Sequence, residues 1–198
     1  MLQRKDIVVF DFDGTLSAGD ANRDFFKYCL MHSVRPWFYL PRMGAALVGN
    51  IFNQDSMWWR ENIRKFLTEK MVADFSDDFI KKHLKKRFDW AKKTVAKERT
   101  RGNKVVLISA GADFLIEKLV SDIKFDAVLT SIFDKKKPWH YKFLCFGKNK
   151  VVAMDKWARE NKYIPNVVRA YSDSKSDMPI MSIAKEQIWI NRRTGKRK

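Results

Sequence analysis

Short runs of apolar residues recur along the chain, and each ends in polar residues or glycine. The first run, residues 7–10, leads directly into Asp11. Such runs predict strands at about residues 5–11, 104–109, 126–132, 167–172 and 187–191, with helical spacing between them. Residues 135–146 are expected to form a hairpin beside these strands. Strands that alternate with helices favour an α/β fold, so we predict a Rossmann-like core with a mainly parallel sheet.

Residues 18–97 follow another pattern, because they contain several stretches of helical period and no clear strand. Three helices are expected there, with candidate N-caps at Asp20, at Asp55 or Ser56, and at Ser76 or Asp77. The third helix is expected to run on to Trp90. We therefore predict two parts: a core of residues 1–17 and 98–198, and an inserted helical cap of residues 18–97 that covers the sheet edge.

Asp11 and Asp13 stand one residue apart at the end of the first strand, and Gly14 follows them. In open α/β sheets, ligands bind at the carboxyl ends of the strands. Two carboxylates at such a place repel each other, so a bound cation or a shared proton is expected. An Asp-Gly pair after a strand is also ordinary turn chemistry, and this interpretation stays open.

Two further segments end in groups that can meet a phosphate. Residues 104–108 lead into Ser109, whose hydroxyl can bind an anion beside free backbone N–H groups or can simply cap a helix. Lys150 stands in the first turn of a predicted helix after Gly147, where a cation opposes the helix dipole unless an anion lies nearby. A chain this rich in lysine places lysines near many helix starts, so Lys150 alone indicates little.

A fourth segment, residues 167–171, leads into a second pair of acids. Asp173 lies at the strand terminus, and Asp177 lies near the start of a helix that contains Pro179. Helix capping accounts for Asp177 but not for Asp173. The four segments therefore bring acids, a hydroxyl and a lysine toward one edge of the predicted sheet.

Together these four segments resemble the four signature motifs of the haloacid dehalogenase superfamily of phosphatases and phosphotransferases. The resemblance covers essentially the whole chain and implies the fold of that superfamily. The spacing of Cys145, Gly147 and Lys150, with the long insertion after the first motif, is similar to subfamily IB. This branch contains phosphoserine phosphatases and a bacterial phosphatidylglycerophosphate phosphatase. Ser172 departs from the pattern, because many members carry glycine there.

The resemblance implies a role for each matching acid. Asp11 is expected to attack phosphorus and form an aspartyl-phosphate, and Asp13 is expected to act as the general acid and base. A Mg²⁺ cofactor is expected on Asp11, Asp173 and the backbone carbonyl of Asp13. Asp177 and Ser174 are expected to orient these groups without touching the ion.

Three residues are expected to hold the phosphate, again by resemblance. They are Ser109, Ala110 and Lys150. Lys150 would also weaken the repulsion between the phosphate and Asp11, because its positive charge lies between two negative groups.

The chain carries 40 Lys and Arg against 23 Asp and Glu, for a formal net charge of +17. Such a surface attracts polyanions, either an anionic membrane or nucleic acid. No nucleic-acid-binding module is recognisable, so no specific nucleic-acid partner is expected. Residues 192–198 are expected to form a frayed basic tail.

Residues 36–52 are strongly apolar, but Arg42 and two prolines disfavour a helix that spans a bilayer, which needs roughly 20 uninterrupted apolar residues. Two interpretations remain open for this stretch. It lies in the interface of a membrane, or it forms the interior of the cap or a dimer surface.

The remaining signals concern location and metal binding. Cys29 and Cys145 are too few for a disulfide framework, which fits a reducing compartment. The amino terminus runs directly into the first strand without a signal peptide, so we expect a cytoplasmic protein, with peripheral contact with the inner membrane face as an open alternative. His32, His83 and His140 lack metal-ligand spacing, so core or surface roles are expected.

Three functions remain open on this sequence. The first is a Mg²⁺-dependent phosphate monoester hydrolase for a lipid-linked phosphate such as phosphatidylglycerophosphate, which the apolar stretch and the basic composition favour. The second is a phosphatase of a small soluble monoester such as phosphoserine. The third is a basic surface-binding protein that keeps the fold without catalysis, which the matches at all four motifs disfavour. The expected partner is thus a phosphorylated small molecule or a lipid head group, with peripheral contact with an anionic membrane.

Overall fold

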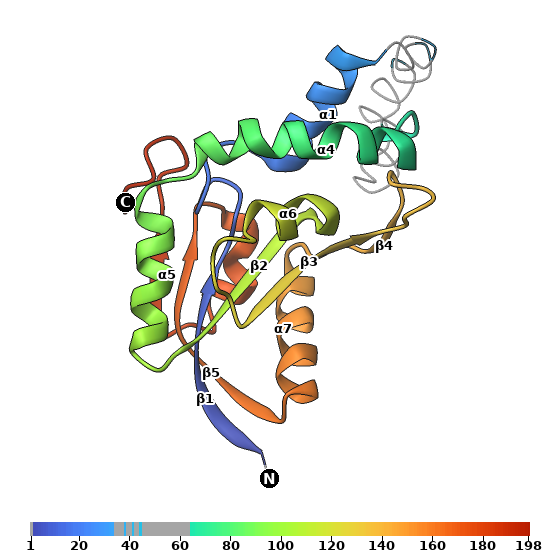
Figure 1. The fold of residues 1–198 in the computed structure, drawn as a ribbon. Coiled ribbons are helices and arrows are strands. Elements are labelled where there is room, and N and C mark those ends of the chain that lie inside the picture. The colour runs from blue at the N-terminus through green and yellow to red at the C-terminus, as the bar shows by residue number, and fades with distance from the viewer. Residues whose placement is uncertain (1, 34–37, 39–40, 42–43, 45–63) are drawn as a thin grey trace.

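A six-stranded sheet runs through the computed structural model, which describes residues 2–33, 38, 41, 44 and 64–198 (Figure 1). Its strands are β1 (Gln3–Phe10), β2 (Lys104–Ala112), β3 (Ala127–Phe133), β4 (Tyr141–Phe143), β5 (Tyr163–Ser172) and β6 (Glu186–Trp189). Their order is β4-β3-β2-β1-β5-β6, and only β3 and β4 pair antiparallel. The prediction of an α/β fold with a mainly parallel sheet is confirmed.

The second half of the central strand β1, residues 7–10, is buried on both faces. Val8 and Phe10 pack in one apolar cluster with residues of α5 (Trp90–Thr100) and α6 (Asp113–Leu119). Ile7 and Val9 pack in a second cluster with residues of α7 (Lys148–Glu160) and α8 (Met178–Met181). Helices on both faces account for the apolar run of residues 7–10, since neither face of this half of the strand meets water. Figure 1 shows α5 and α7 on opposite sides of the sheet.

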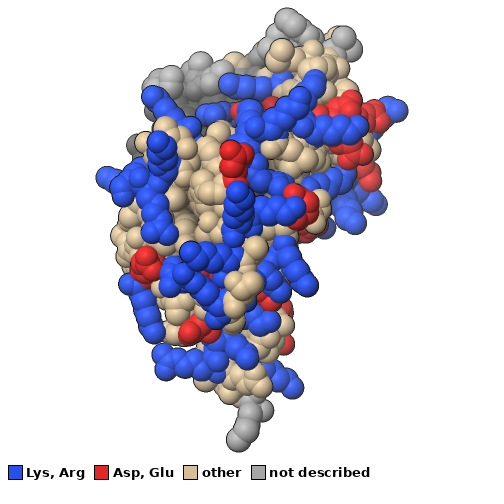
Figure 2. Space-filling model, turned by 60° about the vertical axis from the view of Figure 1, so that its left-hand side comes forward, with Lys and Arg blue, Asp and Glu red and all other residues tan. Residues whose placement is uncertain are grey.

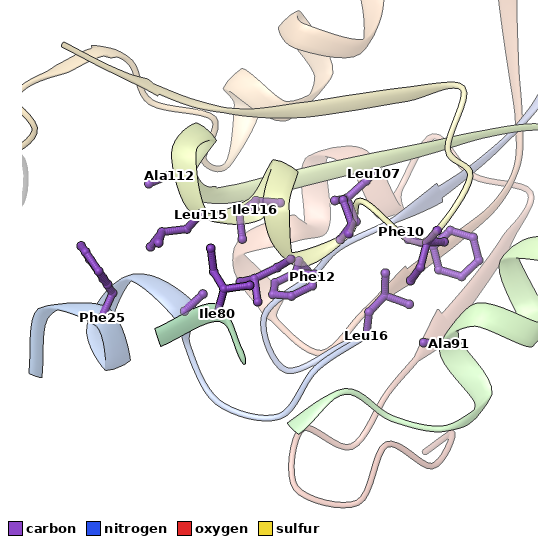
Figure 3. Packing of buried hydrophobic residues seen from close by; sticks show 14 of the residues in the cluster. Phe10, Phe12, Leu16, Phe25, Ile80, Ala91, Leu107, Ala112, Leu115 and Ile116 are labelled. Carbon is purple, nitrogen blue, oxygen red and sulfur yellow. The ribbon is translucent and has the colours of Figure 1, made fainter. Parts of the chain in front are cut away.

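Two helices from the predicted cap range, α1 (Ala21–His32) and α4 (Glu69–His83), cross the carboxyl end of the sheet (Figure 1). Asp20 caps α1 as predicted, and its carboxylate accepts a hydrogen bond of 2.8 Å from the N–H of Arg23. Phe25 of α1 and Ile80 of α4 belong to the same buried cluster as Phe12, and Figure 3 shows Ile80 on the side of Phe12 that faces Phe25. The core of the sheet therefore continues into these helices.

The prediction for the third helix was wrong at both ends. Thr68 caps α4 through a hydrogen bond of 3.2 Å from the N–H of Met71, and Ser76 lies buried in the middle of the helix. The helix ends at His83, a short 3₁₀ turn η2 (Leu84–Lys86) follows, and α5 begins at Trp90. The apolar spacing runs through this break, so periodicity alone could not locate it.

The break has a tertiary cause. The N–H of Phe88 donates to the carbonyl of Leu16 at 3.0 Å, and the N–H of Ala18 donates to the carbonyl of Lys86 at 2.9 Å. The chain segments that enter and leave the helical region thus pair with each other. The division into a core of 1–17 and 98–198 and a cap of 18–97 stays a prediction, although α5 packs on the sheet through Ala91 and Val95.

Two expectations lie largely outside the described residues. They are the second cap helix, with its candidate caps Asp55 and Ser56, and the apolar stretch 36–52, of which only residues 38, 41 and 44 are described. Within the described part of the chain, none of the helices combines the length and the apolar character that crossing a bilayer requires.

The basic segment after β6 is ordered instead of frayed, which corrects the prediction for it. The N–H of Asn191 donates to the carbonyl of Lys196 at 2.8 Å, and the N–H of Lys198 donates to the carbonyl of Trp189 at 2.8 Å. Residues 190–198 therefore form a turn that folds back on β6, called the basic hairpin below. Figure 1 shows it near the carboxyl end of the sheet, beside the junction between α4 and α5.

Candidate functional site

A cavity of ≈ 170 Å³ opens at the carboxyl end of the sheet and is called the acidic cavity below. Seven of the residues that the sequence analysis singled out line it: Asp11, Asp13, Ala110, Lys150, Asp173, Ser174 and Asp177. Five of the residues that it did not assign to the site also line it: Asp20, Asn22, Arg64, Ser176 and Arg192. Residues from all four motif segments thus meet at the edge where parallel sheets bind ligands.

The first and fourth motifs touch at Gly14. This residue has a φ of +78°, and a Cβ added to it would lie 2.4 Å from Oδ2 of Asp173. Only glycine tolerates both this backbone conformation and this approach. In addition, the N–H of Asp11 donates to the carbonyl of Tyr171 at 3.0 Å, which ties the ends of β1 and β5 together. The acids that follow the two strands therefore converge on one place.

A buried ion triad joins the first, third and fourth motifs. Lys150 Nζ lies 2.7 Å from Asp11 Oδ1 and 2.7 Å from Asp177 Oδ1. All three side chains are buried. Lys150 comes from the first turn of α7, so its position opposite the helix dipole is balanced by two carboxylates. Because one cation serves two acids, the triad keeps a negative formal charge.

Ser172 forms a hydrogen bond with the carboxylate of Asp177. Its hydroxyl donates to Asp177 Oδ2 at 2.7 Å and accepts from the N–H of Ser174 at 3.1 Å. The departure from glycine at position 172 therefore adds a buried hydrogen bond to the acid. Ser174 turns its own hydroxyl to the N–H of Ser176 at 3.2 Å, which shapes the short loop before the 3₁₀ turn η3 (Lys175–Asp177).

The pKa of the Asp11 carboxyl is raised to about 6, chiefly because the group is buried, with the charges of Asp177 and Asp173 acting in the same direction and Lys150 opposing them. Burial likewise raises the pKa of Asp173, while Arg192 opposes the rise. The acids at this edge therefore lack enough positive charge around them. Such a site is suited to bind a cation or a cationic side of a ligand.

Asp13 has a different environment from that of Asp11. Its Oδ1 accepts a hydrogen bond of 2.7 Å from the N–H of Ala21, the first residue of α1. Burial raises the pKa of Asp13 well above its ordinary value, the charge of Asp20 raises it further, and the bond from Ala21 lowers it. The carboxyl of Asp13 thus favours its protonated form, which is the form that donates a proton.

The second motif differs in detail from the prediction. Strand β2 continues to Ala112 instead of ending at Ser109, and α6 begins only at Asp113. The hydroxyl of Ser109 is buried and accepts a hydrogen bond of 3.0 Å from the N–H of Gly111. Ala110, and not Ser109, lines the acidic cavity. A contact of Ser109 with phosphate stays a prediction.

The donor set around the acidic cavity fits a hard divalent cation such as Mg²⁺. Asp11 and Asp173 offer carboxylate oxygens, and burial raises the pKa of each acid, a rise that a bound cation would offset. Asp13 uses one carboxylate oxygen on Ala21, so its main-chain carbonyl is the donor expected from it. Among the described residues, no group of three or more His, Cys, Asp or Glu side chains is arranged to hold a metal ion. The expected set needs only two such side chains.

Of the five polar cavity residues that sequence reasoning did not assign to the site, three come from segments outside the four motifs or join them to other elements. Asn22 joins α1 to the second motif, because its amide contacts the carbonyl of Ala110 at 3.4 Å and accepts from the N–H of Ala112 at 2.9 Å. Arg64 reaches the cavity and donates to the hydroxyl of Tyr141. Arg192 reaches it from the basic hairpin. A single Asn or Arg in a highly charged chain carries no local signal that could have marked these positions.

Comparison with known proteins gives a family match over most of the chain. The profile described as haloacid dehalogenase-like hydrolase matches residues 8–182. This range contains all four motifs. No curated protein sequence matches the chain.

Several solved structures share the fold. A protein with unknown function from Bordetella pertussis Tohama I has a TM-score of 0.75 at 16% identity, over 96% of this chain and 91% of that one. A phosphoserine phosphatase in apo form has a TM-score of 0.67 at 17% identity, over 94% and 86%. A phospho-aspartyl intermediate analogue of phosphoserine phosphatase has a TM-score of 0.62 at 16% identity, over 95% and 87%. At these identities the likeness shows the fold.

Proposed function

The chain belongs to the haloacid dehalogenase-like hydrolase family, and on this premise we propose that it is a Mg²⁺-dependent phosphatase that hydrolyses phosphate monoesters through an aspartyl-phosphate. The observation that supports this best is the meeting of Asp11, Lys150 and Asp173 in one small polar cavity. A nucleophilic carboxylate, a cation for phosphoryl oxygens and a further acid for a metal ion are the groups that this reaction needs.

In the first half of the reaction, an oxygen of Asp11 forms a bond to phosphorus, and the bond between phosphorus and the ester oxygen breaks. Lys150 keeps Asp11 in place at 2.7 Å and stabilises negative charge on the phosphoryl oxygens. The leaving oxygen takes a proton from Asp13, whose raised pKa keeps that proton available. Asp11, Asp173 and the main-chain carbonyl of Asp13 would hold Mg²⁺, whose positive charge would lower the repulsion between the carboxylate of Asp11 and a phosphate dianion.

In the second half, a water molecule attacks the aspartyl-phosphate. Asp13, now without its proton, takes a proton from the water, so one carboxyl acts in both directions. Inorganic phosphate leaves and Asp11 returns to its free form. Asp177 and Ser172 do not touch the reacting atoms in this scheme, but they hold Lys150 at the site through the contacts of 2.7 Å described above.

For the substrate we propose a small phosphorylated molecule, with phosphoserine as the first compound to examine. The cavity is polar and smaller than the roughly 300 Å³ at which pockets for larger ligands begin. Two of the similar solved structures are phosphoserine phosphatase, one in apo form and one as a phospho-aspartyl intermediate analogue. This reverses the order of substrates expected from the sequence, because the apolar stretch 36–52 that favoured a lipid lies largely outside the described residues.

A lipid phosphate such as phosphatidylglycerophosphate remains the second candidate, on one observation. Figure 2 shows Lys and Arg side chains spread across one face of the molecule, where they outnumber the Asp and Glu side chains among them. Such a face attracts an anionic bilayer. A cytoplasmic location, peripheral contact with a membrane and membership of subfamily IB remain parts of this proposal.

The test is phosphate release with and without Mg²⁺ from phosphoserine, phosphatidylglycerophosphate, phosphatidic acid and an aryl phosphate. The Asp11→Asn variant should lose at least about 10³-fold in kcat while its thermal unfolding stays cooperative. Asp155→Asn, a change in α7 at a residue that does not line the acidic cavity, serves as the control. Full Mg²⁺-dependent turnover by Asp11→Asn would refute the mechanism.

A further inference from the structure

The basic hairpin is closed by a hydrogen bond of its own and packs against a distant part of the chain. The carbonyl of Asn191 accepts from the N–H of Gly195 at 2.8 Å, which closes the turn. Gly195 has a φ of +68°, and a Cβ added there would lie 2.5 Å from the ring of Phe88. The hairpin therefore packs directly on the segment that joins η2 to α5. A turn held in this way can present a side chain at a defined place.

That side chain is Arg192, which lines the acidic cavity. Arg192 Nε lies 3.3 Å from Asp173 Oδ2. The side chain of Asp173 is 4% exposed and that of Arg192 is 62% exposed, so the guanidinium touches a buried acid while the rest of the side chain stays open to solvent. A guanidinium carries five N–H donors in a planar fork, more than a contact with one carboxylate oxygen can use.

The reacting phosphate does not account for this arginine. Lys150 already provides the buried cation at Asp11, and the main chain around Ala110 faces the same cavity. Arg192 approaches from another segment, on the side of Asp173. A planar, bidentate donor at the rim of a phosphate site is suited to a second carboxylate or phosphate on the same ligand.

We propose that Arg192 is a specificity-determining residue, whose guanidinium binds a second anionic group of the substrate beside the phosphate that is hydrolysed. This inference rests on the proposed function and adds the chemical class of the substrate: a phosphate monoester that also carries a carboxylate or a phosphodiester. A soluble amino-acid phosphate and a phospholipid head group both have this chemistry.

The experiment measures binding by calorimetry in the Asp11→Asn background, with Mg²⁺ present, so that no ligand turns over. Three probes are used: inorganic phosphate, phosphoserine, and a short-chain, water-soluble phosphatidylglycerophosphate. Arg192→Ala is compared with Arg193→Ala, which removes the same charge from the next position of the same hairpin. The side chain of Arg193 is exposed and does not line the cavity. The comparison separates a specific contact from the general attraction of a basic surface.

Arg192→Ala should weaken the binding of at least one two-anion probe by about tenfold, and should change the affinity for inorganic phosphate by less than about twofold. Arg193→Ala should leave all three affinities within about twofold. A loss confined to phosphoserine identifies a soluble substrate, and a loss confined to the lipid probe identifies a lipid head group.

Three results would overturn the inference. They are an equal effect of the two variants, an equal loss for inorganic phosphate, and a parent protein that binds the two-anion probes no better than inorganic phosphate. The proposed function can fail on its own. It fails if the protein with Asp11 intact hydrolyses none of the monoesters, even when the binding data show that Arg192 contacts the second anion.

Discussion

The two ends of the sheet each hold acids that are largely removed from water among basic residues, but the balance of charge differs between them. At the amino end, Asp126 accepts hydrogen bonds from the N–H of Val105 at 2.9 Å, from Lys104 Nζ at 2.9 Å and from Arg99 at 2.7 Å. Burial alone would raise the pKa of Asp126, but these three donors lower it overall. One acid there has more than one cation.

At the carboxyl end the ratio is reversed. Asp11 and Asp177 share Lys150, and the pKa values of Asp11, Asp13 and Asp173 are all raised, chiefly by burial. Acids and basic residues thus stabilise the fold at the amino end of the sheet. At the carboxyl end the same residue types leave the negative charge of the site incompletely neutralised. The difference indicates that the amino end contributes to stability and that the carboxyl end is adapted to a charged ligand.

Removal of the shared cation should have the largest effect on this comparison. Lys150→Met leaves two buried acids without a cation, which should lower the free energy of unfolding by about 3–5 kcal/mol at pH 7. In the wild type Asp11 has a pKa of about 6, above its ordinary value of 3.8, and Lys150 holds it down, so in the variant this pKa should lie higher still and protonation should relieve the repulsion as the pH falls. The deficit, measured by urea unfolding, should therefore be smaller at pH 5 than at pH 7.5.

The matched control for this prediction is Lys148→Met, a change at an exposed residue of the same helical turn. It should alter the free energy of unfolding by less than about 0.5 kcal/mol at either pH. A Lys150→Met deficit that is as small as that of the control would contradict the account of the triad.

Asp126→Asn should affect stability without affecting catalysis. The variant loses charge-assisted hydrogen bonds from Lys104 and Arg99, which should cost about 1–3 kcal/mol at pH 7. Because the folded state lowers the pKa of Asp126, its stabilisation is present above the ordinary value near 3.8 and is lost as the pH falls through the lowered value. Urea unfolding from pH 7 to pH 3 should show the wild type and the variant converging at the acid end.

The same variant also tests the separation of the two ends. Its kcat and KM should stay within about twofold of the wild-type values at a temperature where both are folded, since Asp126 does not line the acidic cavity. Loss of kcat in a fully folded variant would show that the two ends are coupled.

His83 should give the smallest effect. It lies buried between Phe12 and Phe79, and burial lowers its pKa to about 4, with Lys86 lowering it further and Asp24 opposing. Its stabilisation as a neutral ring is present above the ordinary value of 6.5 and is lost as the pH falls through 4. From pH 6.5 to 5.5 this should remove about 1 kcal/mol of stability.

Proton NMR can follow the His83 ring directly. Its resonance should titrate near pH 4, and a His83→Leu variant should show a correspondingly flatter loss of stability over the same interval. Titration near pH 6.5 would mean that the ring is solvated and that the junction between Phe12 and α4 is less closely packed than described.

Much of the core could be predicted because its signals are local. The apolar run of β1 is buried on both faces, so each of its residues has to be apolar. Asp11 follows this run directly, which marks it as an acid at a strand end. Asp20 caps its helix through a bond to a residue three positions on. Such features can be predicted from the sequence because the interacting residues lie only a few positions apart along the chain.

Local reasoning failed where distant segments decide the outcome. The third helix ends at His83 because the chain then pairs with residues 16–18, and its spacing gives no sign of that pairing. Arg64 and Arg192 look like many other basic residues until the fold brings them to the cavity.

The sequence by itself thus determined the strands, the α/β class and the acids that stand at the strand ends. Only the tertiary structure decided how those acids share one lysine, which arginines join them and where the helical region is tied to the sheet. The physical reason is that charge balance and burial at a site depend on every segment that reaches it, while a sequence pattern records only neighbours along the chain.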